Sequence, residues 1–162
     1  LLDLKVYSAK SLQIAETSKL LENTYRSINI ALINQIKFFC DKMKINIFDV
    51  IDAAKTKPFG FQAFYPGPGY GGHCIPVDPN YLKWKGKKLG LDLSFITLAN
   101  KINDQLQERV SKKINDFINK KKLKKKILIV GVSYKKNIND IRNSPALKII
   151  YTLKRKEYDI SL

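Results

Sequence analysis

The sequence predicts a mainly α central domain followed by the start of a partial α/β, Rossmann-like domain. Apolar residues recur with a helical period over residues 11–44, and a second helical pattern covers residues 94–119. Beyond them, at residues 127–131, an unbroken apolar run enters a glycine turn that a further helix follows, as at the opening of a doubly wound domain. A lysine-rich change of composition near residue 120 marks the expected boundary.

The composition narrows the class of protein. The chain has 162 residues, of which 44% are apolar, enough for a folded core. No apolar run approaches the roughly 18 residues that span a bilayer, and the start of the chain lacks a signal peptide. The two cysteines form no disulfide framework. We therefore expect a cytoplasmic protein without a membrane partner, and both ends of the chain look cut from something larger.

The formal net charge of +16 raises a nucleic-acid alternative. The basic residues are scattered along helices instead of being interleaved with aromatics, and no zinc-finger or helix-turn-helix signature is present. The lysine run over residues 120–126 is typical of a solvated helix end. We therefore expect no nucleic-acid partner, and the positive charge also suits ligands that carry diphosphates.

The first half of the chain is expected to be helical after a short strand within residues 1–10. The long helix over residues 11–44 carries an apolar stripe of Leu21, Tyr25, Ile28, Leu32 and Phe39. Further apolar residues widen this surface, so we expect burial on more than one side, by other helices or by a second subunit. A short helix over residues 47–55 follows, with Asn46 as its N-cap.

The second half begins with a structured loop over residues 56–79, rich in glycine, proline and aromatic residues. Helices are predicted over residues 80–89 and 94–119. A fully buried strand at residues 127–131, a helix over residues 144–156 and a second strand at Tyr158 are expected to complete the chain.

The glycine-rich loop is the segment in which the sequence predicts chemistry. Its glycine spacing fits neither a dinucleotide fingerprint nor a P-loop, so the glycines are expected to present Cys74. A thiol near the start of a helix can be activated as a nucleophile, and Asp78 could bind a water. The alternative is that Cys74 is an inert core residue. We expect His73 to pack in the loop, pointing away from Cys74 because neighbours in an extended segment diverge, and Cys40 to be structural.

Three segments resemble the UDP-glucose/GDP-mannose dehydrogenase family in the family's own order. Residues 56–82 are similar to its active-site loop, residues 15–26 to the start of its central helix, and residues 131–145 to the first turn of its C-terminal nucleotide-binding domain. The form Gly-Gly-His-Cys-Ile-Pro-Val-Asp-Pro resembles the branch that acts on UDP-N-acetylhexosamines. The glucose and GDP-mannose branches usually carry lysine where this chain has Val77.

The resemblance implies an NAD-dependent enzyme that oxidises the C6 alcohol of a nucleotide sugar to a carboxylate in two hydride transfers. Cys74 would trap the intermediate aldehyde as a thiohemiacetal, which becomes a thioester that water hydrolyses. Lys19 would stabilise the oxyanion, and Asn23 would donate a hydrogen bond to it or to the water. Asp78 would assist proton transfer and hold the water.

The same resemblance implies a substrate site. Lys135 and Arg142 would contact diphosphate oxygens, and Tyr65 would pack on the sugar or nucleotide. The backbone of the loop would approach the ligand closely at three glycines, namely Gly69, Gly71 and Gly72. We assign no metal ligands. NAD would be bound mainly by an N-terminal domain that matches no part of this chain, so this chain alone is expected to be inactive.

The expected organisation is the end of that N-terminal domain at residues 1–10, a dimerisation domain at residues 11–120, and a truncated UDP-sugar-binding domain at residues 121–162. A homodimer would form through the helix over residues 11–44. The leading hypothesis is a UDP-N-acetylhexosamine 6-dehydrogenase that serves surface polysaccharide synthesis. UDP-glucose 6-dehydrogenase and a non-catalytic helical dimerisation module are the alternatives, and a basic nucleic-acid binder ranks third.

Overall fold

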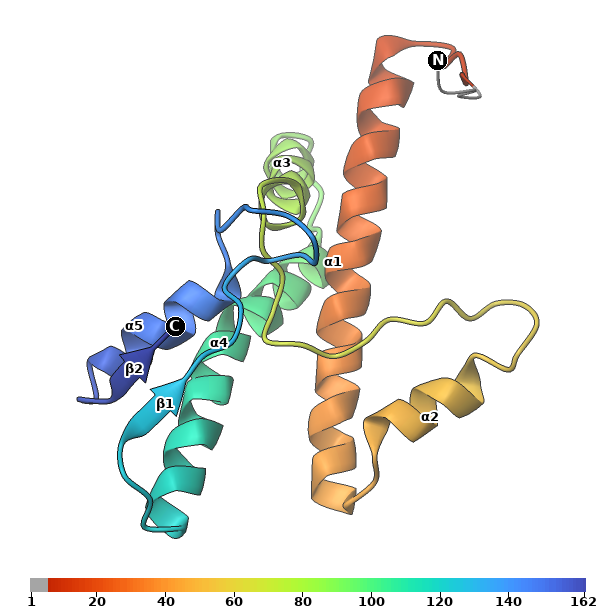
Figure 1. Cartoon of the computed structure of the whole chain (residues 1–162). Coiled ribbons are helices and arrows are strands. Elements are labelled where there is room, and N and C mark those ends of the chain that lie inside the picture. Colours follow the sequence, from red (N-terminus) through yellow and green to blue (C-terminus); the bar gives the residue numbers. More distant parts are fainter. Residues whose placement is uncertain (1–5) are drawn as a thin grey trace.

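The structure, a computed structural model, describes residues 6–162 and is mainly helical (Figure 1). Five helices and two short strands are described, and they follow one another along the chain in the order α1 Leu12–Met43, α2 Ile47–Ala54, α3 Cys74–Lys88, α4 Ser94–Lys120, β1 Lys126–Leu128, α5 Pro145–Lys154 and β2 Asp159–Ser161.

The long helix α1 begins and ends where the sequence predicts. The Ser11 side chain accepts a hydrogen bond from the Ile14 N–H at 3.3 Å, which satisfies one of the free amides of the first turn. Lys44 adopts a left-handed conformation with φ of 57°, and its N–H bonds back to Asp41, which ends the helix. The N-cap predicted at Asn46 is also confirmed, because its side chain accepts from the Phe48 N–H at 3.1 Å.

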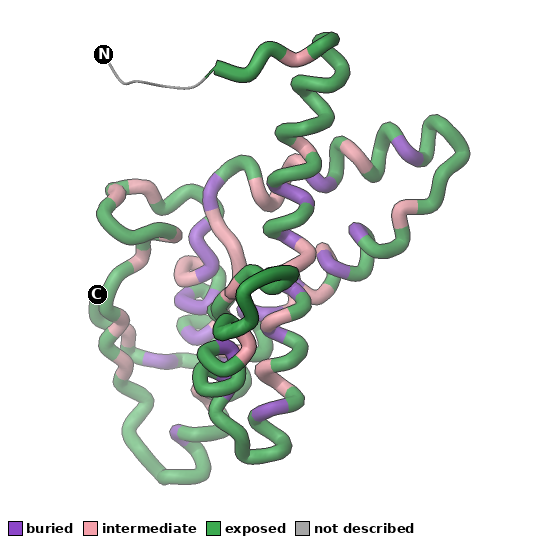
Figure 2. The backbone as a smooth tube through the Cα atoms, turned by 90° about the vertical axis from the view of Figure 1, so that its right-hand side faces the viewer, coloured by how far each residue is buried: buried purple, intermediate pink, exposed green. Residues whose placement is uncertain are grey.

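The two faces of α1 are unlike each other. Helices α3 and α4 pack against a face of small and polar residues, and the buried members of that face are Asn23, Thr24, Ser27, Ala31 and Asn34. The predicted apolar stripe lies on the other side, where Leu21, Leu32 and Phe39 are exposed. Figure 2 shows the first turns of α1 fully exposed, with buried segments alternating with exposed ones farther along. The described residues therefore leave most of the stripe uncovered, and Phe64 of the crossing loop lies against Tyr25 with ring centroids 5.8 Å apart.

Helix α2 and the loop after it project from one side of α1, and the loop then crosses α1 to reach α3 (Figure 1). A small cluster of Cys40, Ile47 and Ile51 fastens α2 to the end of α1, which confirms a structural role for Cys40. The crossing loop carries the predicted reactive segment, so its path brings residues near 70 back over α1 and α4.

Helix α3 begins at Cys74, six residues before the predicted start at Asn80. The prediction was wrong because Pro76 and Pro79 were taken as loop residues. Pro76 lies in the first helical turn, where a backbone N–H has no partner in any case. Asn80 lies one turn farther on, and its side chain donates to the Pro76 carbonyl at 2.9 Å.

The C-terminal segment forms one parallel βαβ unit, as predicted. Lys126–Leu128 pairs in parallel with Asp159–Ser161, and α5 connects the two strands, with Ser144 as its N-cap. The expectation of a fully buried first strand is wrong, because Leu128 is 69% and Val130 89% exposed. Only one face of this two-stranded sheet is covered by helices within the described residues.

The main apolar core joins α4 to this βαβ unit. Ile118, Ile149, Leu153 and Tyr158 are buried together, with Ile127 of β1 and Ile160 of β2 packed against them. The core therefore crosses residue 120, and the predicted division of the chain there stays a prediction.

Two further expectations can be compared with residues 6–162. A strand was expected within residues 1–10: residues 1–5 lie outside the described part of the chain, and residues 6–10 form no strand. None of the helices in the described part combines the length and the apolar character that crossing a bilayer requires.

We expect Asn103→Ala to lower the free energy of unfolding by about 1–3 kcal/mol. Asn103 is buried between α4 and α1, and its amide donates to the Ser27 carbonyl at 2.9 Å. Losing the side chain removes that bond and leaves a gap between the helices. Urea unfolding followed by circular dichroism would measure the change, with Asn119→Ala at the exposed end of α4 as the control. Equal unfolding free energies would contradict this role.

Candidate active site

The glycine loop is held by polar side chains from the helices beneath it. The Asn34 side chain accepts from the Gly67 N–H at 3.2 Å, and the Gln107 amide donates to the Pro68 carbonyl at 3.0 Å. Both side chains are buried, so these bonds are shielded from water. Gly69 has φ of 128°, which a side chain rarely allows, and a Cβ there would collide with the Gln107 amide.

Tyr70 anchors the same loop through its phenol ring. Burial is the main cause that raises its pKa, and the nearby Asp104 carboxylate adds to the effect. Hydrogen bonds with Ser27 and Asn103 act in the opposite direction. The ring therefore fixes the loop on α1 and α4 as a neutral group at neutral pH.

Cys74 is the first residue of α3, and its side chain is exposed. Among the described residues no side chain caps this helix end, so the partial positive charge of the N-terminal amides is free to favour an anion. His73 precedes it in a helical conformation, with φ of −95° and ψ of −48°. The prediction of an extended segment at His73 is therefore wrong. Neighbouring side chains diverge in an extended segment, but that geometry does not apply to His73 and Cys74.

Asp78 lies four residues after Cys74, so both residues occupy one face of α3. The Asn23 amide on α1 donates to the Asp78 carboxylate at 2.5 Å. Asn23 is 2% exposed and Asp78 is half-buried. The structure thus groups three of the predicted catalytic residues, Cys74, Asp78 and Asn23. The hydrogen bond between Asn23 and Asp78 joins residues that are 55 positions apart in the sequence.

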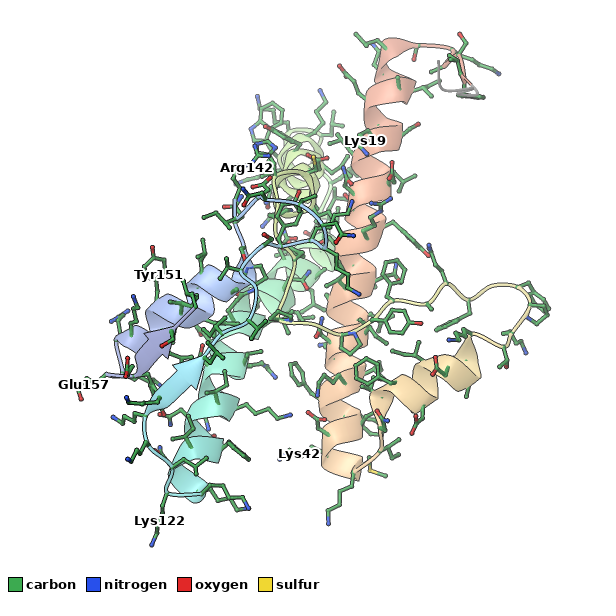
Figure 3. The ribbon with its side chains drawn as sticks, viewed as in Figure 1. Lys19, Lys42, Lys122, Arg142, Tyr151 and Glu157 are labelled. Atoms are coloured by element: carbon green, nitrogen blue, oxygen red, sulfur yellow. The ribbon has the colours of Figure 1, made fainter. Side chains whose placement is uncertain are left out.

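Lys19, the fourth predicted catalytic residue, makes a different contact. Its ammonium group lies 3.2 Å from the Glu22 carboxylate, which also pairs with Arg26 at 2.7 Å. The Lys19 side chain is 60% exposed. Figure 3 shows Lys19 and Arg142 on the two sides of α3 in that view.

Arg142 reaches the glycine loop from the C-terminal segment. Its carbonyl accepts from the Gly72 N–H at 3.0 Å, and its guanidinium donates to both carboxylate oxygens of Asp140, the shortest contact being 2.7 Å. The Asp140 hydrogen bond and charge raise the pKa of Arg142, with smaller additions from the Tyr134 hydroxyl and the Cys74 thiol. The Arg142 backbone thus joins the C-terminal segment to the glycine loop two residues before Cys74.

The other predicted binding residues are more dispersed. Gly71 and Gly72 lie against the C-terminal segment, and Lys135 is exposed in the turn over residues 131–139, which lines a surface hollow. Tyr65 is half-exposed on the crossing loop, and its hydroxyl contributes to the raised pKa of Lys55 after the larger effect of Asp52. The structure therefore places Tyr65 beside α2.

Sequence reasoning missed the residues that join these parts. Asn143 donates its amide to the Gly72 carbonyl at 3.0 Å, and Asp140 fixes Arg142. The spacing of Asp140 two residues before Arg142 is a signal of a local turn, because a carboxylate there can also accept from the Arg142 N–H, here at 2.9 Å. Asn143 carries no comparable signal. Within residues 6–162 no group of three or more metal-binding side chains is found.

Two family profiles match the chain. Residues 13–105 match the central domain of the UDP-glucose/GDP-mannose dehydrogenase family, and residues 128–162 match its UDP binding domain.

Similar proteins agree with these profiles. The chain is 40% identical over 150 residues to a UDP-N-acetyl-D-mannosamine dehydrogenase of Methanococcus maripaludis, covering 92% of the chain and 34% of that protein. It is 35% identical to a UDP-N-acetyl-D-glucosamine 6-dehydrogenase of Pseudomonas aeruginosa, covering 96% and 37%. A solved UDP-D-ManNAc dehydrogenase of Pyrococcus horikoshii superposes with a TM-score of 0.81 at 32% identity, covering 91% of the chain and 35% of that structure. The chain spans about a third of the length of these relatives.

Proposed function

Because the chain belongs to the UDP-glucose/GDP-mannose dehydrogenase family, we propose that it is part of an NAD-dependent UDP-N-acetylhexosamine 6-dehydrogenase. The enzyme would oxidise the C6 alcohol of the sugar to a carboxylate for surface polysaccharide synthesis. The observation that carries this proposal is the grouping of Cys74, Asp78 and Asn23 at the start of α3, with the Arg142 carbonyl hydrogen-bonded to the preceding loop at Gly72. The relatives named for N-acetylated sugars support the substrate class.

The proposed reaction converts one alcohol, two NAD⁺ and one water into a carboxylate, two NADH and three protons. NAD supplies the hydride acceptor in both oxidations, and we assign its binding mainly to a domain outside these 162 residues. The Cys74 thiolate adds to the C6 aldehyde and gives a thiohemiacetal. Loss of a second hydride from that carbon gives a thioester, and water then cleaves the C–S bond and returns the thiolate. A helix N-terminus suits both the thiolate and the developing oxyanion.

Asp78 is the group we assign to the water and its proton. It lies on the same face of α3 as the thiol, and the Asn23 amide fixes its carboxylate. An oriented carboxylate can hold a water beside the thioester and take its proton as the water attacks. Asn23 is thereby a positioning residue for Asp78, and Lys19 would stabilise the oxyanion after leaving Glu22.

Substrate binding is assigned to the turn before α5 and to the glycine loop. Lys135 and Arg142 would bind the diphosphate, since both are exposed cations on the segment that matches a UDP binding domain. Gly69, Gly71 and Gly72 would shape the loop beside the ligand, because their lack of a side chain lets the loop pack closely against Gln107 and Tyr134. Tyr65 would have to reach the sugar or nucleotide from the crossing loop.

The assembly we propose is a cytoplasmic homodimer formed through α1. The uncovered stripe on α1 supports a partner subunit, and the coverage of only a third of each relative supports a longer polypeptide that supplies the remaining domains. The three-part organisation with limits at residues 10 and 120 is retained, and the 162 residues alone would then be inactive.

The test is NADH formation by the longer enzyme that contains this chain, with UDP-N-acetylglucosamine, UDP-N-acetylmannosamine and UDP-glucose offered separately. We expect about two NADH per sugar, as the two oxidations require, with one of the N-acetylated sugars and little with UDP-glucose. Preferred turnover of UDP-glucose would change the proposed substrate from a UDP-N-acetylhexosamine to UDP-glucose. No NADH formation with any of the three sugars would refute the proposal.

A non-catalytic dimerisation module is the second candidate, and the uncovered stripe on α1 favours it as well. It predicts a stable dimer without binding of UDP. Calorimetry with UDP separates the two, because the enzyme proposal requires binding at the turn over residues 131–142.

A further inference from the structure

Two segments that are 71 positions apart meet at a single residue, Gly72. Its N–H donates to the Arg142 carbonyl, and its own carbonyl accepts from the Asn143 amide, each at 3.0 Å. Gly72 is buried, so both bonds are protected from competing water. The glycine loop is therefore fastened to the turn before α5 through both polar groups of one peptide residue.

The contact is close because neither glycine there carries a side chain. A Cβ at Gly71 would lie 2.5 Å from the Tyr134 Cβ and 2.9 Å from the Asn143 carbonyl. A Cβ at Gly72, where φ is 80°, would lie 2.8 Å from the Tyr134 ring. The turn thus covers the loop at van der Waals distance, and movement of one segment must move the other.

Gly72 is two residues before the thiol and directly precedes the N-cap of α3. Whatever fixes Gly72 also fixes where α3 starts, and hence where the exposed Cys74 side chain lies. On the other segment, Arg142 adjoins Asn143, and its side chain is 72% exposed, so its free edge can meet an anion. The glycine loop therefore leads to the Cys74 thiol, and the turn hydrogen-bonded to it carries the Arg142 cation.

Asn143 is suited to this contact in both backbone and side chain. Its φ of 50° is a left-handed conformation, which asparagine adopts more readily than most residues. This geometry turns its amide toward Gly72 while its neighbour Arg142 faces solvent.

We propose that Asn143 is a positioning residue that couples the nucleotide-binding turn to the thiol of Cys74 by holding the Gly72 carbonyl. The inference rests on the proposed binding of the UDP moiety by Arg142. Binding of the diphosphate beside Arg142 then acts on the thiol, because Gly72 joins this turn to the loop two residues before Cys74. Loss of the hydrogen bond between Asn143 and Gly72 would uncouple the turn from the thiol, although Arg142 and Cys74 would both remain in the protein.

The test uses two variants that keep the backbone conformation of residue 143. Asn143→Gly removes the amide and tolerates a positive φ. Asn143→Asp keeps the shape and places a carboxylate oxygen against the Gly72 carbonyl. Glu157→Gly is the matched control: Glu157 also has a positive φ, of 61°, and lies at the far end of α5 (Figure 3). If Asn143→Asp does not fold, Asn143→Gly still answers the question.

The measurement is the rate of alkylation of Cys74 by iodoacetamide, with and without UDP, in the longer enzyme. Mass spectrometry of the Cys74 peptide gives the rate, and buried Cys40 serves as the unreactive reference within the same protein. Calorimetry reports the binding of UDP in parallel. We expect UDP to slow the alkylation of Cys74 by roughly fivefold or more in the unmodified protein and in Glu157→Gly, a typical size for coupled sites.

In Asn143→Gly and Asn143→Asp we expect UDP to bind and the effect on alkylation to disappear. With the sugar substrate, kcat should fall by roughly 10–100-fold with a smaller change in KM, as misplacement of a reacting group produces. An equal effect of UDP in Asn143→Asp would show that the nucleotide shields the thiol directly and would overturn the inference. UDP binding without any effect in the unmodified protein would overturn the inference alone. No binding of UDP there would refute the proposed role of the turn as well.

Discussion

Replacing Cys74 by serine is expected to lower NADH formation by the longer enzyme by about 10³-fold or more. A serine hydroxyl stays protonated near neutral pH, so it adds poorly to an aldehyde. The thiohemiacetal would not form, and the second hydride would have no tetrahedral carbon to leave. Steady-state absorbance at 340 nm with the preferred UDP-sugar measures the loss.

The control is Cys40→Ala, which removes the other thiol of this chain. Cys40 is 3% exposed in the cluster with Ile47 and Ile51, so its loss should affect stability and leave kcat close to that of the unmodified enzyme. Thermal unfolding of both variants separates loss of folding from loss of chemistry. Unchanged NADH formation by the serine variant would return Cys74 to a structural role and refute the thioester route.

The helices were the most predictable part of the fold because local chemistry determines their ends. Ser11 and Asn46 cap the helices that they were expected to begin, and Lys44 ends the first of them. The helix from Ser94 to Lys120 also agrees with its apolar period. A cap or an apolar period acts over one or two turns, so a single stretch of sequence contains the needed information.

The start of α3 was less predictable because proline is common both in loops and in the first turn of helices. Pro76 and Pro79 indicate a loop by frequency, yet Pro76 lies in the first helical turn, where a backbone N–H has no helical partner, and Pro79 lies inside the helix. The resulting error changed the chemistry at Cys74, since a thiol at a helix start differs from a thiol in an extended loop.

The site itself depends on contacts that no local pattern contains. The resemblance to a family named Asn23 and Asp78, and the structure adds that one hydrogen bond joins them. Neither the resemblance nor the spacing pointed to Asn143, whose partner lies 71 positions away. Polar side chains that hold a loop look like ordinary surface residues until the fold brings them to their carbonyl.

The apolar stripe of α1 shows that periodicity predicts which residues share a face and leaves open what covers it. Its members occupy one side of the helix as expected, but Leu32 is 52% and Phe39 60% exposed. Within the chain, α3 and α4 instead cover the face that contains Asn23 and Asn34. Several large apolar side chains in one row on a single helix indicate a surface that another molecule covers.

We therefore expect Leu32→Glu combined with Phe39→Glu to convert the homodimer of the longer enzyme into monomers. A two-fold interface places the same surface of both subunits together, so each dimer would bury four carboxylates among apolar groups. Removing apolar contacts and burying unpaired charges should raise the dissociation constant by about 10³-fold or more. Sedimentation velocity across a range of concentrations measures that change.

Asn119→Glu is the control, because it adds one carboxylate at the exposed end of α4, away from the stripe. The control should remain a dimer, and the paired substitution on α1 should leave the helical circular-dichroism signal in place, since both changed side chains are exposed in the single chain. A dimer that persists in the paired variant would place the interface elsewhere. A monomeric unmodified enzyme would refute the dimer altogether and leave the stripe for one of the domains that the longer polypeptide supplies.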